Sequence, residues 1–241
     1  MEKMNTMNRN KSFIKSIKWL FLACLILSVT ACSTNNDREY WGLNDNVKSC
    51  FERYYKVEKK FGKWENGNLE YHGHYQVSFD KKGQYQEIDY YDYDMNLSGK
   101  IIPVRKNNKI IEEQYYDEGG TLRSITKINQ ISNRESQYES FNEDGEKVAF
   151  GKSIRKAGKL MEQNQTIVRD DSENEIYTTT HEYDKDGNVI SFKRISSESE
   201  VDLHVRYEYL EFDEKKNWTK RLMYVDDDEP QNIAVREIEY Y

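Results

Sequence analysis

The stretch "HEYDKDGNVISF", His181 to Phe192, places strand-forming residues on both sides of a tight polar cluster. Tyr, Val, Ile and Phe favour strands, whereas Asp, Gly and Asn favour turns. The Asp184 carboxylate can accept a hydrogen bond from a backbone N–H two residues on. Gly187 can adopt the left-handed conformation that closes a short hairpin. The stretch therefore predicts a β-hairpin, the local unit of an antiparallel sheet.

A calcium-binding loop is the alternative interpretation of the same carboxylates. An EF-hand loop needs glycine at its sixth position and a bidentate glutamate at its last. With Gly187 as the sixth residue, the last position falls on Lys193; a loop that starts at Asp184 puts Val189 at the glycine position. Neither register works, so we interpret the cluster as a structural turn.

Most of the chain alternates with a period of two. In "LEYHGHYQVSF", Leu69 to Phe79, apolar residues and glycine fall on one face and polar residues on the other, as they do in "VDLHVRYEY" from Val201. Polar clusters with glycine or asparagine separate such stretches. The sequence predicts one all-β domain, a long antiparallel meander of roughly thirteen strands that forms an open curled sheet or a partial barrel, because sheets of more than about ten strands tend to curl.

The N-terminus has the three parts of an export signal: a basic head, an apolar run and a small-residue exit. The apolar run is shorter than the roughly 20 residues that span a bilayer. The exit "VTAC", Val29 to Cys32, resembles the bacterial lipobox, which implies a lipid such as palmitate on the Cys32 thiol. The alternatives are an ordinary signal peptide and lipidation of Cys24, which lies inside the apolar run.

This resemblance divides the chain into a signal peptide (1–31), a polar tether (32–42) and the β-meander domain (43–241). It implies a lipid-anchored protein of the cell envelope. Ser33, directly after the cysteine, resembles the residue that directs such lipoproteins to the outer membrane, where the protein would face the periplasm or the surface. Cys50 would be the one unmodified cysteine, so no intramolecular disulfide is expected. The formal net charge is -7 without a basic stripe, which excludes nucleic acid as a partner.

One unit recurs along the meander: an aromatic residue, then Asp or Asn, two variable residues and usually glycine. Its copies start at Phe79, Tyr116, Phe141, Tyr183 and Phe212, the last with Lys216 in place of glycine. "YDKDGNV" is the most complete copy. The unit resembles the YD or Rhs-type repeat, and the resemblance implies a carbohydrate-binding role.

Few residues indicate catalysis or a cofactor. There is no nucleophile elbow and no glycine-rich phosphate loop. His72 and His74 share one strand face, but the other histidines are isolated, so we expect a pair on the solvent face without metal. Cys50 lies in an alternating segment, where a lone thiol most often packs. We expect no catalytic residue, metal or cofactor, although abundant carboxylates leave glycoside hydrolysis open.

Tyrosine is the commonest aromatic residue, with 19 copies against 9 phenylalanines. In "QYQEIDYYDY" we expect Ile88 and Tyr90 to face the core. The opposite face would then present aromatic rings and carboxylates that suit a sugar, and we predict ligand binding by Tyr85, Glu87, Asp89, Tyr91 and Tyr93. The alternative is plain β-propensity.

The expected function is that of a membrane-anchored, non-catalytic envelope lipoprotein that binds glycan or a protein partner. A structural or toxin-neutralising envelope protein is the second interpretation, and a glycan-active enzyme is the third.

Overall fold

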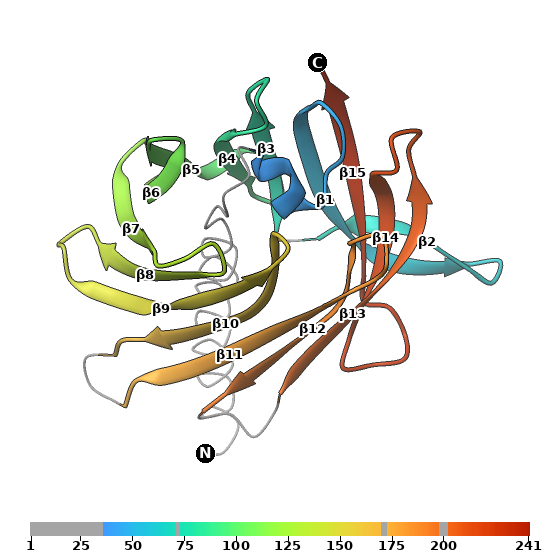
Figure 1. The fold of residues 1–241 in the computed structure, drawn as a ribbon. Coiled ribbons are helices and arrows are strands. Elements are labelled where there is room, and N and C mark those ends of the chain that lie inside the picture. Colours follow the sequence, from blue (N-terminus) through green and yellow to red (C-terminus); the bar gives the residue numbers. More distant parts are fainter. Residues whose placement is uncertain (1–35, 71–72, 170–172, 198–201) are drawn as a thin grey trace.

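The polypeptide runs back and forth through 15 β-strands joined by short turns and preceded by a short 3₁₀ helix (Figure 1). The structure is a computed structural model that describes residues 36–70, 73–169, 173–197 and 202–241. The elements are η1 (Asp37–Trp41), β1 (Val47–Lys60), β2 (Lys63–Leu69), β3 (His74–Phe79), β4 (Tyr85–Tyr91), β5 (Leu97–Lys106), β6 (Lys109–Asp117), β7 (Leu122–Gln130), β8 (Glu135–Asn142), β9 (Lys147–Lys156), β10 (Lys159–Ile167), β11 (Glu175–Tyr183), β12 (Val189–Ser196), β13 (Leu203–Phe212), β14 (Trp218–Val225) and β15 (Asn232–Tyr240). From β3 to β15 each strand is the antiparallel neighbour of the next. The predicted all-β class is confirmed.

The sheet closes on itself because the last strand pairs with the first. β15 is antiparallel to β1, from Val47 opposite Tyr240 to Lys56 opposite Asn232. β1 also pairs with β3, so 14 strands form a closed ring, and β2 adds a hairpin to the far half of β1. The prediction of an open sheet of roughly thirteen strands is therefore wrong in both closure and strand count. Local periodicity does not reveal closure, which depends on pairing between the two ends of the chain.

Six turns share one structure, and this explains the recurring sequence unit. In each turn the first residue exchanges backbone hydrogen bonds with the residues three and four positions on, and its side chain accepts the N–H four positions on. The first residues are Asp80, Asp92, Asp117, Asn142, Asp184 and Asp213. The fourth residue has positive φ and is glycine in four turns, but Met95 and Lys216 in the others. The hairpin predicted at Asp184 is confirmed, and the turn at Asp92 escaped the pattern because Met95 replaces the glycine.

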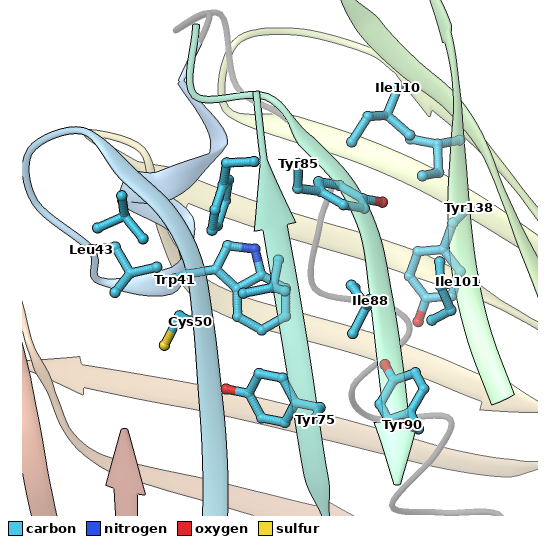
Figure 2. Close-up of a cluster of buried hydrophobic side chains, with 14 residues drawn as sticks. Trp41, Leu43, Cys50, Tyr75, Tyr85, Ile88, Tyr90, Ile101, Ile110 and Tyr138 are labelled. Carbon is cyan, nitrogen blue, oxygen red and sulfur yellow. The ribbon is translucent and has the colours of Figure 1, made fainter. Parts of the chain in front are cut away.

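Side chains alternate between the interior and the outside of the barrel. On the inner face Cys50 of β1 lies opposite Val77 of β3, which lies opposite Ile88 of β4, which lies opposite Ile101 of β5. All four are at most 1% exposed. Figure 2 shows Cys50, Ile88 and Ile101 within one cluster of buried side chains. The interior along β1 and β3–β5 is therefore apolar, with tyrosines between the aliphatic residues.

The 3₁₀ helix η1 packs into one end of the barrel. The N–H of Asp37 donates to the carbonyl of Gly83 in the β3–β4 turn, and the Arg38 guanidinium donates to the carbonyls of Val47 and Asp80. The Trp41 ring lies 5.4 Å from that of Tyr75 on β3. Residues 37–41, which the sequence assigns to the tether, are thus packed against the barrel.

The outer face of the barrel carries charged residues opposite one another on successive strands, beside exposed apolar residues such as Phe150 and Ile176. Glu112 of β6 lies opposite Lys127 of β7, which lies opposite Glu139 of β8. Asp89 of β4 likewise lies opposite Lys100 of β5. In the part of the chain that the structure describes, there is no helix long and apolar enough to cross a membrane.

Candidate functional site

Glu52 of β1 carries a buried negative charge between two arginines. Its carboxylate accepts hydrogen bonds from Arg236 Nε at 2.8 Å and Arg221 Nη2 at 3.0 Å, and from the hydroxyls of Tyr54 and Tyr75. Burial alone would raise the pKa of Glu52, but the two guanidiniums and the tyrosine hydroxyls lower it to about 2. The carboxylate is therefore ionised and saturated with donors at neutral pH, which suits a structural role better than proton transfer.

A second buried cluster joins η1 to the barrel wall. Asp37 pairs with Arg105 of β5 and accepts the Tyr85 N–H at 2.9 Å. The Tyr85 hydroxyl donates to Glu113 of β6 at 2.5 Å. Burial raises the pKa of Glu113 to about 7, against the opposing effect of the Tyr85 hydrogen bond. A shifted carboxyl is common in active sites, but Glu113 is 3% exposed and its hydroxyl partner is fully buried, so it has no open cleft in which to act.

The interior along β8–β11 is polar, unlike the opposite side of the barrel. Ser136 lies opposite Ser153, which lies opposite Gln163, which lies opposite Thr179. In the next inward-facing row, Gln165 lies opposite Tyr177. The polar inner wall is defined as Ser136, Ser153, Gln163, Gln165, Tyr177 and Thr179, all of them buried. Within the described chain, Ser153 Oγ and Gln165 Nε2 have no hydrogen-bond partner.

Arg194 of β12 extends the polar inner wall with a positive charge. It lies opposite Thr179, and its Nε donates to Thr179 Oγ1 at 3.2 Å. Its guanidinium carbon lies 5.7 Å from the centre of the Tyr177 ring. Among the described residues no carboxylate forms an ion pair with Arg194. Burial, and then the charges of Arg194 and Arg155, lower the pKa of the neighbouring His181 to about 4, so the imidazole is neutral in this positive region.

A second candidate surface lies on the outer face of β1, β3 and β4. Phe51, Gln76 and Asp89 lie side by side on these strands, and the Phe51 and Tyr91 rings are 5.3 Å apart. Glu87 stands beside them on β4. Burial, and then the Glu87 charge, raise the pKa of Asp89, whose Oδ1 has no partner among the described residues. We call these five residues the outer platform.

The structure separates the residues predicted to bind a ligand. Glu87, Asp89 and Tyr91 belong to the outer platform, and Tyr93 is 44% exposed in the β4–β5 turn. Tyr85 is fully buried inside the barrel, so its predicted place on the outer face is wrong. The reason is an irregularity beside the Asp80 turn, where Phe79 pairs with Tyr85 although Ser78 pairs with Glu87. One extra residue puts Tyr85 on the inner face.

Phe51 and Gln76 are platform residues that sequence reasoning missed, since only strand pairing brings β1 and β3 beside β4. The same holds for the polar inner wall. Its residues come from four strands, and none of its segments carries a motif.

The remaining candidates have structural partners or lie outside the described residues. The predicted place of His74 on the solvent face is wrong, because the side chain is fully buried. It accepts the Tyr54 N–H at Nδ1 (3.1 Å) and places Nε2 2.8 Å from the Glu70 carbonyl. Both ring nitrogens are thus engaged by the backbone. Cys50 packs in the core, where burial raises the pKa of its thiol to about 12. His72 and the predicted lipidation site Cys32 lie outside the described residues.

Comparison with solved structures finds porin-like proteins. One, from Bacteroides uniformis, is 9% identical with a TM-score of 0.44, over 82% of this chain and 98% of that chain. Another, from Bacteroides vulgatus, is 11% identical with a TM-score of 0.49, over 82% and 99%. No family model matches the sequence, and no curated protein matches it.

The predicted resemblance to YD or Rhs-type repeat proteins is wrong. The similar structures are porin-like proteins, and no repeat-family model matches. The recurring unit has a local cause, because each three-residue hairpin loop that ends in a left-handed residue favours the same Asp and Gly.

Proposed function

We propose that the chain is a non-catalytic binding protein of the cell envelope, held at a membrane by a lipid on Cys32 while its barrel stands in water. The observation that supports this most directly is a row of charged residues on the outer face of adjacent strands. A membrane-spanning barrel presents an apolar band to lipid, and each Lys or Arg at the bilayer midplane costs about 2–4 kcal/mol. The outer row of Glu112, Lys127 and Glu139 on adjacent strands is unsuited to such a band.

The anchor then has to come from the N-terminal segment. The lipobox-like "VTAC" ends at Cys32, and Ser33 follows it, which favours the outer membrane and a periplasmic or surface-exposed barrel. Since η1 packs into one end of the barrel, the lipid and the barrel are joined by only a few residues. The barrel would therefore lie close to the membrane surface.

Palmitate labelling tests the anchor. Cys32→Ser removes the acceptor thiol, so labelling should be lost and the uncut precursor should accumulate. Cys24→Ser is the matched control and should label normally. The reverse pattern would refute the assignment. In parallel, the chain that starts at Ser33 should stay monomeric in buffer without detergent, whereas aggregation relieved by detergent would contradict a barrel that stands in water.

For the ligand we propose a glycan on the outer platform. Phe51 and Tyr91 offer ring faces for the apolar side of a sugar, and the Glu87 and Asp89 carboxylates can accept its hydroxyls. The unpartnered Asp89 Oδ1 supports this use. A protein partner remains the alternative ligand for the same surface.

A glycan array with the purified chain tests the platform. Tyr91→Ala should weaken binding by about 1 kcal/mol, the contribution of one stacked ring, with little effect on folding. Its neighbour Tyr90 is 6% exposed and faces inward, so Tyr90→Ala should lower the melting temperature instead. If no glycan binds, or if Tyr91→Ala leaves binding intact, the platform is not a glycan site.

A further inference from the structure

We propose that the interior of the barrel binds a small, anionic, polyhydroxylated molecule of the class of the sugar acids, with Arg194 as the anchor for its carboxylate. The proposal shares with the proposed function only the premise that the chain is a binding protein. It uses the polar inner wall, whose side chains point away from the outer platform.

The width of the ring leaves room for a ligand. A barrel of about eight strands is just wide enough for its own side chains to fill, and wider barrels enclose ligands or channels. Here 14 strands close the ring, and the extensive contacts of the described strands are with neighbouring strands of the sheet and, for β10, with η1. Most inward residues of β8 and β9 are small, namely Ser136, Ser140, Ala149, Gly151 and Ser153, and the large ones among them are Tyr138 and Arg155. The small side chains are too short to reach across a ring of 14 strands.

Unsatisfied polar groups on this wall indicate what the ligand must supply. Ser153 is 0% exposed and Gln165 is 6% exposed, yet Ser153 Oγ and Gln165 Nε2 have no partner among the described residues. A buried polar group without a partner costs about 1–3 kcal/mol, and native proteins keep such groups rare. Ser153 of β9 lies opposite Gln163 of β10, and Gln165 is two residues further along β10. Several hydroxyls on one small molecule would satisfy them together.

The charge of the interior favours an anion, although the chain as a whole is acidic. The buried inward carboxyl groups already have partners: Asp37 pairs with Arg105, Glu52 with two arginines and Glu175 with Arg169, and Glu113 accepts a hydrogen bond from the Tyr85 hydroxyl. Arg194 has no carboxylate partner among the described residues and is half-buried. A guanidinium presents a planar fork of donors that matches a carboxylate.

The neighbours of Arg194 suit the rest of a sugar acid. The Tyr177 ring beside its guanidinium offers a face for the apolar side of a sugar. Thr179, opposite Arg194, places a hydroxyl within 3.2 Å of the guanidinium Nε. Arg194 lies near the end of β12, away from the barrel end that η1 occupies, so a ligand would enter from the opposite end.

Titration calorimetry on the full chain, purified in a detergent without a sugar headgroup, tests the inference with three probes. Glucuronate carries both the carboxylate and the hydroxyls, glucuronamide carries the hydroxyls without the charge, and inorganic phosphate carries the charge alone. We expect glucuronate to bind about tenfold or more tightly than either of the others, because a charged hydrogen-bonded pair contributes about 1.5–3 kcal/mol. Equal binding of phosphate would reveal an unspecific anion site and overturn the proposal.

Two variants of one strand give the matched comparison. Arg194→Met keeps the length of the side chain and removes the inward charge, and it should weaken glucuronate binding about tenfold or more and abolish the preference over glucuronamide. Lys193→Met removes an outward charge from the adjacent residue, which pairs with Asp202, and should leave binding unchanged.

Gln165→Met should reduce affinity without lowering the melting temperature, since Nε2 has no partner to lose. If glucuronate fails to bind, or binds Arg194→Met as well as the native chain, the inference is overturned. If binding is lost in Tyr91→Ala but kept in Arg194→Met, the ligand occupies the outer platform, and the proposed function stands without the inner site.

Discussion

Replacing Glu52 by glutamine should destabilise the barrel more than any comparable change on its outer surface. The substitution keeps the shape of the side chain but leaves Arg221 and Arg236 inside the barrel without their shared counter-charge. Breaking a buried ion pair by neutralising one partner costs about 3–5 kcal/mol. The pKa gives a similar figure, because a fall from the ordinary value of 4.5 to about 2 corresponds to about 3 kcal/mol of stability at neutral pH.

The lowered pKa of Glu52 also sets how the stability depends on pH. A carboxyl whose folded pKa lies below its unfolded pKa stabilises the protein above the unfolded value, and this contribution is lost as the pH falls through the folded value. For Glu52 the window lies between pH 4.5 and about 2. The difference in stability between native chain and Glu52→Gln should therefore be constant above pH 5 and shrink below pH 4.

Urea unfolding of the chain that starts at Ser33, followed by tryptophan fluorescence, measures this difference because Trp218 packs against both arginines. Glu237→Gln is the control. Glu237 follows Arg236 on β15 but points outward to Arg53 with 65% of its side chain exposed, and an exposed pair contributes at most about 1 kcal/mol. A loss below about 1 kcal/mol in Glu52→Gln at pH 7 would refute the view that Glu52 holds the two arginines.

Three further changes test the interior and the turns. The folded pKa of Glu113 is raised to about 7, so the contribution of this carboxyl group to stability is lost as the pH rises from 4.5 through 7. Urea unfolding should therefore show Glu113→Gln to be more stable than the native chain by about 3 kcal/mol at pH 8 and equal to it at pH 4. Gly151→Ala would place its Cβ 2.0 Å from the Asn164 carbonyl oxygen and should lower the stability by about 3 kcal/mol in thermal melts. Gly145→Ala meets open space at a φ of 80° and should lower it by only about 1 kcal/mol. Asp184→Ala removes the side-chain acceptor of the Asp186 and Asn188 N–H groups and should cost about 1 kcal/mol without changing the response to calcium.

The local elements of the fold could be predicted because they follow from local chemistry. The turn at Asp184 has the hydrogen bonds and the left-handed Gly187 that its residues indicate. Alternation places Ile88 and Tyr90 inward, as predicted. The same alternation failed for Tyr85, because the bulge that accompanies the turn at Asp80 shifts the inward face by one residue. Turn type and strand facing are thus coupled, and a period of two is reliable only beyond the first residues after each turn.

Closure could not be predicted, because it rests on pairing between β1 and β15, which lie at opposite ends of the sequence. No local pattern distinguishes a strand whose edge is free from one whose edge finds a distant partner. The enclosed interior could not be predicted for the same reason, because closure turns one face of every strand into an enclosed surface. Glu52 illustrates this: its arginine partners come from β14 and β15, and before closure it is merely a charged residue in an alternating strand.

The polar inner wall depends most heavily on closure. In the segment Glu162 to Thr166 of β10 every residue is polar, so hydrophobic alternation carries no information about which side faces inward. Only the register, with Gln163 opposite Ser153 and Gln165 opposite Gly151, assigns the two glutamines to the interior. An apolar inner face is visible in the sequence as hydrophobic alternation, as it is along β3 and β4, but it offers a polar ligand no hydrogen-bonding groups. The polar inner wall, where we propose that a ligand binds, is for that reason the part of the barrel with the weakest signature in the sequence.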